Sequence, residues 1–310
     1  MKAVRIHRFG GPDVIAVEDI PAPTPGDDEI LLRVHAASVN PVDYKIREGK
    51  YPPVGHDKLP LVLGRDVSGI VEACGGKAGQ FKPGDAVYTM LEPGHGGYAE
   101  LTLVQGAHAA MKPARLDHVQ AAAVPLAALT AWQGLFDHGR LRSGQRVLIH
   151  GGAGGVGHFA VQFAKARGAT VITTVAGRDV EFAADIGANQ AIDYKAERFE
   201  DVIGEKVDMV FDLVAGETQA RSWAVIKPGG VMVSTLGQPS ADKADSYKVR
   251  AAGYTAQPNG AQLAEIARLI DSGKVKAVID ATFTLSDARQ AQERQQGGHP
   301  RGKIVLKVAA

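Results

Sequence analysis

The sequence has a single cysteine, Cys74, among its 310 residues, so it can form no internal disulfide and no thiolate metal cluster. The surrounding VSGIVEACGG predicts a strand, in which we expect the thiol to behave as a small buried apolar group. No apolar stretch approaches the about 20 residues needed to cross a bilayer. Neither sign of charge is in excess, because 35 lysines and arginines face 34 aspartates and glutamates. Overall charge therefore indicates neither a membrane nor a nucleic-acid partner.

The first residues, MKAVRIHRFGGPDV, predict a strand and lack both the apolar core of a signal peptide and an arginine-rich amphipathic pattern. We therefore expect a cytoplasmic protein. Apolar residues make up 45% of the chain and charged residues 22%, which is typical of a globular protein. A chain of this length exceeds what one core usually supports, so we expect two domains.

Short apolar runs cut by glycine and proline fill about the first 120 residues, a pattern typical of an antiparallel barrel-like domain. From His118 the chain becomes alanine-rich and then alternates between strand-like and helix-like segments, which predicts βαβ units and a parallel sheet. The mixed pattern of the front resumes after about residue 257. The predicted domains are residues 1–122, residues 123–257, and a return to the first domain over residues 258–310.

The stretch IHGGAGGVG lies between a predicted strand and a predicted helix, and Gly152, Gly154 and Gly157 fill the pattern G-x-G-x-x-G. We expect the first glycine to allow the tight turn, the second to let the backbone approach a pyrophosphate, and the third to let the helix pack closely. Gly155 and Val156 lie in the same turn, and a helix N-terminus offers unpaired amides to phosphates. The pattern predicts a dinucleotide site; the alternative is a glycine-rich turn without a ligand.

An NAD site usually ends its second strand with an acidic residue that binds the ribose hydroxyls. Here that strand, VITTVAGRD, ends in small residues, including Ala176, followed by Arg178. Small residues leave room for a 2′-phosphate and a guanidinium can bind it, so we predict NADPH as the cofactor. The alternative is that Arg178 is solvated and Asp179 binds the ribose. Tyr194 follows the next strand, where it either flanks the adenine ribose or only packs.

Several segments together resemble the medium-chain dehydrogenase/reductase superfamily: AASVNPVDYKIREGKYP, LPLVLGRDVSGIV, GDAVYTM, GGYAELTLV, LTAWQGL, GGAGGVG, IGANQAIDY and RGKIVLKV. Within it they resemble the zinc-independent quinone oxidoreductase branch, which includes enone and alkenal reductases. This resemblance implies an α/β protein in which a Rossmann-type doubly wound parallel sheet domain is inserted into a GroES-like antiparallel β-barrel catalytic domain. It also implies an active site between the two domains and a homodimer.

Zinc-using relatives carry a cysteine near the position of Asn40, a Gly-His-Glu where this chain has Gly64, Arg65 and Asp66, and a further thiolate near Ala127. The four-cysteine lobe of those relatives is absent too. Without imidazole and thiolate ligands no tetrahedral zinc site can be assembled, so we expect no metal. The lone loop histidines His56 and His95 have no ligand spacing. These missing ligands also argue against a zinc alcohol dehydrogenase.

The remaining chemistry is hydride transfer from NADPH to a quinone or an α,β-unsaturated carbonyl. The resemblance implies that Lys45 reaches the nicotinamide ribose and the substrate oxygen, with Asp43 holding its ammonium in place, and that Asn40 and Tyr51 line the substrate pocket. Each of these residues has a simpler alternative as a surface lysine, a capping aspartate or a packing side chain. The proton can come from solvent, and we assign no general acid.

The resemblance also places Thr130 and Lys303 beside the nicotinamide. Val214, Ser234 and Leu236 follow or end predicted strands, where a doubly wound sheet binds its ligand. A different class of function stays open, namely a redox-sensing or moonlighting protein that binds NADPH with only incidental turnover.

Overall fold

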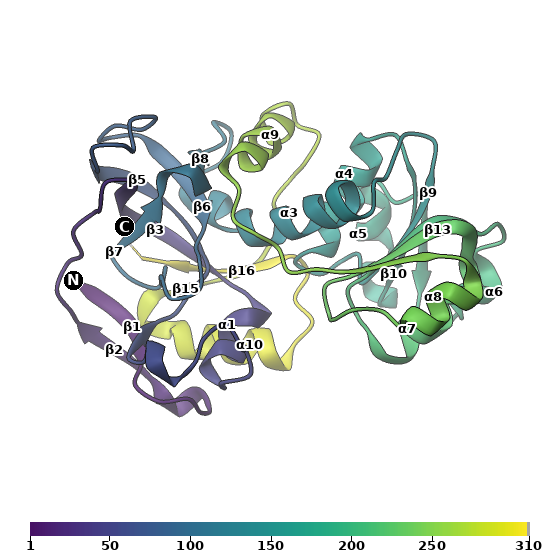
Figure 1. Cartoon of the computed structure of the whole chain (residues 1–310), viewed down its shortest axis with the longest axis horizontal. Coiled ribbons are helices and arrows are strands. Elements are labelled where there is room, and N and C mark those ends of the chain that lie inside the picture. The colour runs from purple at the N-terminus through teal and green to yellow at the C-terminus, as the bar shows by residue number, and fades with distance from the viewer. Residues whose placement is uncertain (309–310) are drawn as a thin grey trace. The chain divides into compact units, whose positions relative to one another are not determined.

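The computed structural model describes residues 1–308 and divides the chain into two units (Figure 1). The first unit consists of Met1–Leu126 together with Pro258–Ala310, and the second consists of Ala127–Gln257. Helix α3 (Pro125–Trp132) carries the chain from the first unit into the second. The chain therefore leaves one unit, builds another, and returns.

The first unit is built on a seven-stranded sheet in the order β15-β16-β3-β5-β6-β8, with β7 also paired to β3. Its strands are β3 (Glu29–Val39), β5 (Asp66–Cys74), β6 (Ala86–Met90), β7 (Leu101–Gln105), β8 (Ala109–Met111), β15 (Ile279–Thr284) and β16 (Lys303–Lys307). All pairs are antiparallel except β15 with β16. The late strand β16 pairs with β3, as the yellow and dark blue ribbons show in Figure 1. This pairing joins the end of the chain to its front.

A smaller three-stranded sheet of the first unit has the order β2-β1-β4 and consists of β1 (Lys2–Ile6), β2 (Ile15–Asp19) and β4 (Leu61–Val62). The alternation of apolar and polar residues explains why β3 forms a strand, since Ile30, Leu32 and Val34 are fully buried while Arg33 is exposed. These side chains join one apolar core with residues of β1 and β16.

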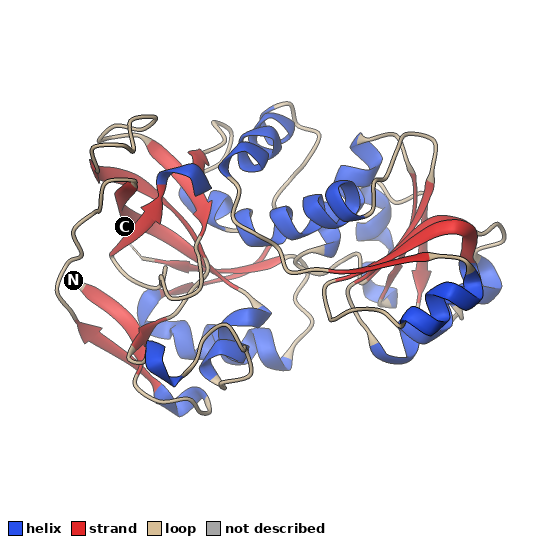
Figure 2. Ribbon diagram, in the orientation of Figure 1, coloured by secondary structure: helices blue, strands red, loops and turns tan. Residues whose placement is uncertain are grey.

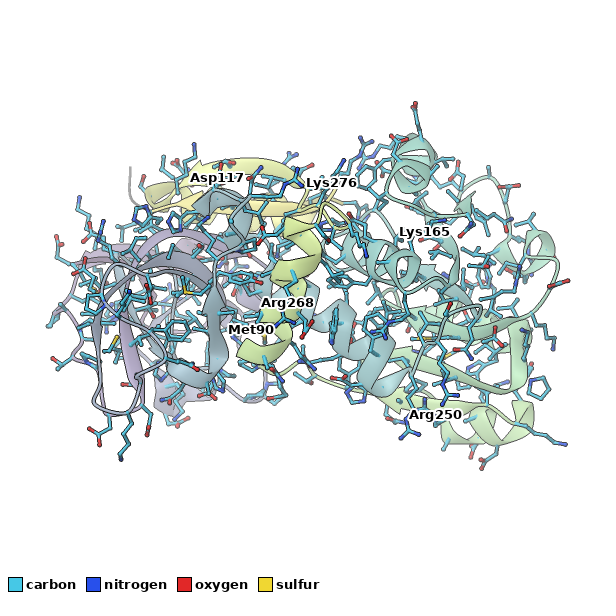
Figure 3. All side chains as sticks on the ribbon, turned by 90° about the horizontal axis from the view of Figure 1, so that it is seen from above. Met90, Asp117, Lys165, Arg250, Arg268 and Lys276 are labelled. Carbon is cyan, nitrogen blue, oxygen red and sulfur yellow. The ribbon has the colours of Figure 1, made fainter. Side chains whose placement is uncertain are left out.

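The helices of the first unit are α1 (Pro41–Arg47), α2 (His118–Ala122), α9 (Gly260–Asp271) and α10 (Ala288–Gly297), with 3-10 turns at Pro12–Val14, His56–Lys58, Gly106–His108 and Leu285–Asp287. Asp117, labelled in Figure 3, caps α2 because its carboxylate accepts from the Gln120 amide at 2.7 Å. Arg268, also labelled, lies on α9, whose buried face includes Leu263 and Ile266.

The second unit is a six-stranded parallel sheet in the order β11-β10-β9-β12-β13-β14. Its strands are β9 (Arg146–His150), β10 (Thr170–Val175), β11 (Gln190–Asp193), β12 (Val207–Asp212), β13 (Ile226–Ser234) and β14 (Arg250–Gly253). Counted from β9, this is the order 3-2-1-4-5-6 of a dinucleotide-binding fold. Buried apolar runs such as Val147–Ile149 fit a sheet that is covered on both faces.

Helices lie on both faces of this sheet (Figure 2). They are α4 (Gly157–Ala166), α5 (Val180–Asp185), α6 (Phe199–Val202), α7 (Gly216–Ser222) and α8 (Ala241–Tyr247), with 3-10 turns at Gly177–Asp179 and Trp223–Val225. A π-helical turn over Gln133–His138 follows α3, and the Gly139 amide donates to the Gly134 carbonyl across it. Gly134 lies against the Phe211 ring, where a Cβ atom would come within 2.5 Å, so a larger residue would have to displace that buried ring.

Candidate functional site

A glycine turn, residues 151–157, joins β9 to α4 in the second unit. Gly151 has a φ of 76°, and the amides of Gly151 and Gly152 donate to the Thr174 carbonyl at 3.0 and 3.1 Å. A Cβ on Gly152 would lie 2.0 Å from Thr173 Oγ1, and one on Gly157 would lie 2.1 Å from the Gly151 carbonyl oxygen. Gly157 thus has the packing role that we expected, but the tight turn is made by Gly151, and Gly152 is required for contact with β10.

The next amides of this turn are available to a ligand. Within residues 1–308, the amides of Gly155, Val156 and Gly157 donate to no acceptor. They lie at the N-terminus of the ten-residue helix α4, which has no side-chain cap. A Cβ on Gly154 would meet only the Gly151 carbonyl oxygen, at 3.4 Å, so the backbone is open on its other side. Unpaired amides at a helix start form a site for an anion such as a phosphate.

Three large side chains at the carboxyl ends of strands of this sheet are exposed. Tyr194 follows β11, Val214 follows β12 and Leu236 follows β13, and these side chains are 52%, 50% and 44% exposed. The carboxyl edge of such a sheet is where ligands bind in doubly wound folds. The predicted residues therefore lie at the same edge as the glycine turn.

Asp212, which we did not predict, holds the loop after β12. Its carboxylate accepts from the amides of Val214 and Ala215 at 3.0 and 2.8 Å, from Gln219 Nε2 at 2.7 Å and from Ser234 Oγ at 2.9 Å. Ala215 has a φ of 66°, an unusual value for alanine that these bonds stabilise. The Ser234 side chain is fully buried and also accepts from the Leu236 amide at 3.1 Å. Ser234, which we predicted to bind the cofactor, thus uses its hydroxyl to fix the loop.

The end of β10 carries charge of both signs. The Arg178 side chain is 66% exposed and its Nε lies 3.5 Å from Oδ2 of Asp179, whose side chain is only 7% exposed. Ala176 precedes this pair and begins the turn Gly177–Asp179. A Cβ on Gly177 would lie 2.5 Å from Oδ2 of Asp193, so a carboxylate does lie beside the end of β10. This carboxylate belongs to Asp193, the last residue of β11, and we did not predict it from the sequence.

A buried polar cluster in the first unit contains Ser38, Asn40, Asp66 and Lys303, all at most 3% exposed. Asp66 Oδ2 accepts from Ser38 Oγ at 2.6 Å and from Asn40 Nδ2 at 2.9 Å, while Oδ1 accepts from the Leu126 amide at 2.6 Å. Lys303 Nζ donates to Asn40 Oδ1 and lies 3.9 Å from Asp66 Oδ2. Burial raises the pKa of Asp66 and lowers that of Lys303. We predicted that Asn40 lines a substrate pocket, but its side-chain amide is directed into this cluster.

Asp43 lies beside this cluster at the start of α1. Its Oδ2 accepts from the Asn40 amide at 2.7 Å and from the Tyr98 hydroxyl at 3.0 Å, and its buried Oδ1 has no partner in the described chain. Burial raises the pKa of Asp43 to about 7, with a smaller contribution from the negative charge of Asp66. The expected pair between Asp43 and Lys45 is not formed among residues 1–308. Residues two apart on a helix do not face each other, so the capping position directs Asp43 away from Lys45.

Three predicted residues remain, namely Lys45, Tyr51 and Thr130. Lys45 and Tyr51 are half-buried, and Tyr51 packs against the apolar core of the first unit. Thr130, on α3, is 7% exposed, and its carbonyl accepts from the Tyr254 hydroxyl.

Comparisons with known proteins match both units. The family models described as alcohol dehydrogenase GroES-like domain and zinc-binding dehydrogenase match residues 26–114 and 186–306. The human NAD(P)H oxidoreductase RTN4IP1, mitochondrial, is 36% identical over 327 residues, covering 91% of this chain and 82% of the relative. The tomato (Solanum lycopersicum) 2-methylene-furan-3-one reductase is 35% identical over 319 residues, covering 99% of this chain and 79% of that relative. The chain belongs to the medium-chain dehydrogenase/reductase superfamily.

Solved structures similar to this medium-chain dehydrogenase/reductase include quinone oxidoreductases. The quinone oxidoreductase from Coxiella burnetii is 38% identical with a TM-score of 0.91, and the match covers 100% of this chain and 99% of that one. The Escherichia coli quinone oxidoreductase complexed with NADPH is 29% identical with a TM-score of 0.88, covering 99% and 100% of the two chains. The predicted fold, a Rossmann-type parallel sheet combined with a GroES-like antiparallel domain, is confirmed.

At the positions where zinc-using members of the superfamily carry ligands, this medium-chain dehydrogenase/reductase has other contacts. Arg65 Nε donates to the Leu91 carbonyl at 2.7 Å, and Asp66 belongs to the buried cluster. In the described part of the chain, no three histidine, cysteine, aspartate or glutamate side chains are grouped so that they could hold a metal ion. Across residues 1–308, no helix combines the length and apolar character that a bilayer crossing demands.

Proposed function

We propose that the chain is an NADPH-dependent oxidoreductase that transfers hydride to quinones or α,β-unsaturated carbonyls without a bound metal ion. The observation that carries this proposal is the glycine turn, whose unpaired amides lie at the carboxyl edge of a sheet with the dinucleotide-binding strand order. The relatives named quinone oxidoreductase and 2-methylene-furan-3-one reductase support the two classes of acceptor. Homodimer formation and a cytoplasmic location stay predictions from the sequence.

The residues of the second unit fit a dinucleotide. We assign the pyrophosphate to the amides of Gly155 and Val156, and the adenine ribose with its 2′-phosphate to Arg178 and Tyr194. Asp193 acts against this assignment, since a carboxylate beside Gly177 repels a phosphate. Arg178 must therefore outweigh Asp193 if NADPH is preferred. When bound, the reduced nicotinamide supplies the hydride.

In the first unit we assign direct contact with the acceptor to Lys45 and Tyr51. A lysine ammonium stabilises negative charge that develops on a carbonyl or quinone oxygen as the hydride arrives. Asn40 and Asp43, 1% and 0% exposed, hold the start of α1, the helix that carries Lys45. We propose that these two residues and Lys303 act through the buried cluster and not by touching the acceptor.

The test has two steps. Titration of NADPH and NADH by fluorescence should show tighter binding of NADPH, and Arg178→Ala should weaken NADPH binding by about 10-fold or more while NADH binding changes little. Loss of reduced-nicotinamide absorbance is then followed with a panel of quinones, short alkenals and cyclic enones. Turnover should survive treatment with a chelator.

Three outcomes would contradict the proposal. Tighter binding of NADH than of NADPH would refute the assignment of Arg178, and loss of activity after chelation would refute a metal-free reaction. Binding of NADPH without turnover of any acceptor would favour the second candidate, an NADPH-binding sensor or moonlighting protein.

A further inference from the structure

His150 is the last residue of β9 and stands directly before the glycine turn, with a fully buried side chain. Its Nδ1 lies 3.0 Å from Thr174 Oγ1, and its Nε2 lies 2.8 Å from Ser222 Oγ. Thr174 is the residue opposite His150 in the register of β10 with β9, and Ser222 is the last residue of α7. The imidazole therefore connects the central strand to a neighbouring strand on one side and to a helix on the other.

The contacts of Ser222 settle which nitrogen carries the proton. A serine hydroxyl has one proton, and that of Ser222 is donated to the Thr218 carbonyl at 2.6 Å. Ser222 Oγ must then accept from His150 Nε2–H, which leaves Nδ1 without a proton in a neutral ring. Nδ1 therefore accepts from the Thr174 hydroxyl.

The chain of hydrogen bonds continues into the turn. Thr174 Oγ1 has donated its own proton to His150, and it accepts from the Gly151 amide at 3.3 Å, an amide that also donates to the Thr174 carbonyl at 3.0 Å. The Gly152 amide donates to the same carbonyl at 3.1 Å. The first two amides of the turn are thus held by Thr174. The amides of Gly155, Val156 and Gly157 have no acceptor among residues 1–308 and remain for a ligand.

The surroundings of His150 keep the ring neutral. Burial lowers the pKa of His150 to about 4, and Arg221 lowers it further, while the negative charges of Asp212 and Glu200 act in the opposite direction. The Phe199 ring contacts the imidazole edge to face at 4.8 Å between centroids. A doubly protonated ring would have no acceptor to offer the Thr174 hydroxyl.

We propose that His150, neutral and protonated at Nε2, is a positioning residue that holds Thr174 and through it the glycine turn in the shape that binds the phosphates of a dinucleotide. The inference rests on the proposed function, because the ligand of the turn is taken to be NADPH. His150 does not touch the ligand itself. It acts through Thr174 Oγ1 on the Gly151 amide, the first amide of the turn.

Two substitutions test the roles of the two ring nitrogens of His150 separately. In His150→Asn the side-chain oxygen can take the place of Nδ1 and accept from Thr174, whereas in His150→Gln the amide nitrogen can take the place of Nε2 and donate to Ser222. We expect His150→Asn to keep the Kd for NADPH within about 3-fold of wild type, and His150→Gln to raise it by about 10-fold. Turnover at saturating NADPH should change much less in both variants. Thermal unfolding of each variant checks that it folds.

Thr174→Val is the matched control, because it removes the hydroxyl and keeps the shape of the side chain. It should weaken NADPH binding as much as His150→Gln does, and the double variant should be no weaker than either single variant. Nitrogen NMR of the labelled wild-type protein should show His150 protonated at Nε2 and unprotonated at Nδ1.

The outcomes distinguish this inference from the proposed function. A wild-type protein that binds neither NADPH nor NADH refutes the proposed function, while the NMR spectrum still decides the hydrogen-bond chain. A wild-type Kd in His150→Gln, or a ring protonated at Nδ1, overturns the positioning role. Additive losses in the double variant overturn it as well, since they would mean that His150 and Thr174 act separately.

Discussion

Replacing Lys303 by methionine tests whether the buried cluster of the first unit depends on its single ammonium group. Methionine keeps most of the length and apolar volume of lysine, so the substitution removes the charge and the donor with little change in packing. Asp66 would keep its three hydrogen-bond donors but lose the cation 3.9 Å away, and Asn40 Oδ1 would lose the donor it has in Lys303.

The size of the effect follows from the distance and the burial. With an effective dielectric constant of about 20, Coulomb's law gives about 4 kcal/mol of attraction between unit charges at 3.9 Å. Both side chains are at most 3% exposed, so solvent screens this attraction little. Removing one partner of a buried pair typically costs about 3–5 kcal/mol, because the other charge stays buried without compensation. We expect Lys303→Met to lower the free energy of unfolding by about 3–4 kcal/mol.

Urea unfolding at neutral pH measures this loss, and two further variants make it specific. Lys307→Met changes an exposed lysine on the same strand and should cost less than about 0.5 kcal/mol. The double variant Asp66→Asn with Lys303→Met removes both charges and should be more stable than Lys303→Met alone. A loss below about 1 kcal/mol in Lys303→Met, or a double variant at least as unstable as the sum of the single changes, would refute the pair as a source of stability.

Three further predictions concern the site. Gly152→Ala should destabilise the protein by about 1–3 kcal/mol, because its Cβ would lie 2.0 Å from Thr173 Oγ1. Gly154→Ala should fold normally and lose dinucleotide affinity, and equal melting temperatures of the two variants would contradict this contrast. Because the pKa of Asp43 is raised, the wild type should lose up to about 4 kcal/mol of stability relative to Asp43→Asn as the pH rises from about 4 to about 7. A stability difference that does not change with pH in urea unfolding would argue against this raised pKa. Lys45→Ala should lower turnover of an enone by about 100-fold with a much smaller change in Kd for NADPH, and full activity would remove Lys45 from the mechanism.

Local sequence patterns predict the parts of the fold that depend on neighbouring residues. The alternation of strand and helix after residue 118 indicates the parallel sheet, and the glycines indicate the turn after its first strand. Even there, the glycine that makes the tight turn is Gly151, one residue before Gly152, to which we assigned that role. Gly151 makes the turn with its positive φ, while Gly152 is required because Thr173 of the adjacent strand is close. That contact is tertiary, so no reading of the turn alone reveals it.

The buried polar contacts were not predictable in the same way. Lys303 and Asn40 are far apart in the sequence and meet only because β16 pairs with β3. His150 and Asp212 end apolar strands, where polar residues look like plain strand termini. Asp43 did offer a signal, because asparagine followed three residues later by an acidic residue before a helix predicts a cap, and the cap competes with the pairing that we expected with Lys45.

Asp66 and Asp212 show two ways of keeping a carboxylate inside the protein, and the difference has a consequence for binding. Asp66 has a cation nearby, whereas the contacts of Asp212 are four hydrogen-bond donors: two backbone amides of the loop after β12, Gln219 and Ser234. Moving that loop would take two of the four donors from a buried carboxylate, which costs about 1.5–3 kcal/mol for each bond lost. The loop is therefore held in one conformation before any ligand arrives, with Val214 exposed at the edge of the sheet. Since a ligand then has no loop to order, less of its binding free energy is lost to conformational entropy, and the edge is preorganised by the carboxylate beneath it.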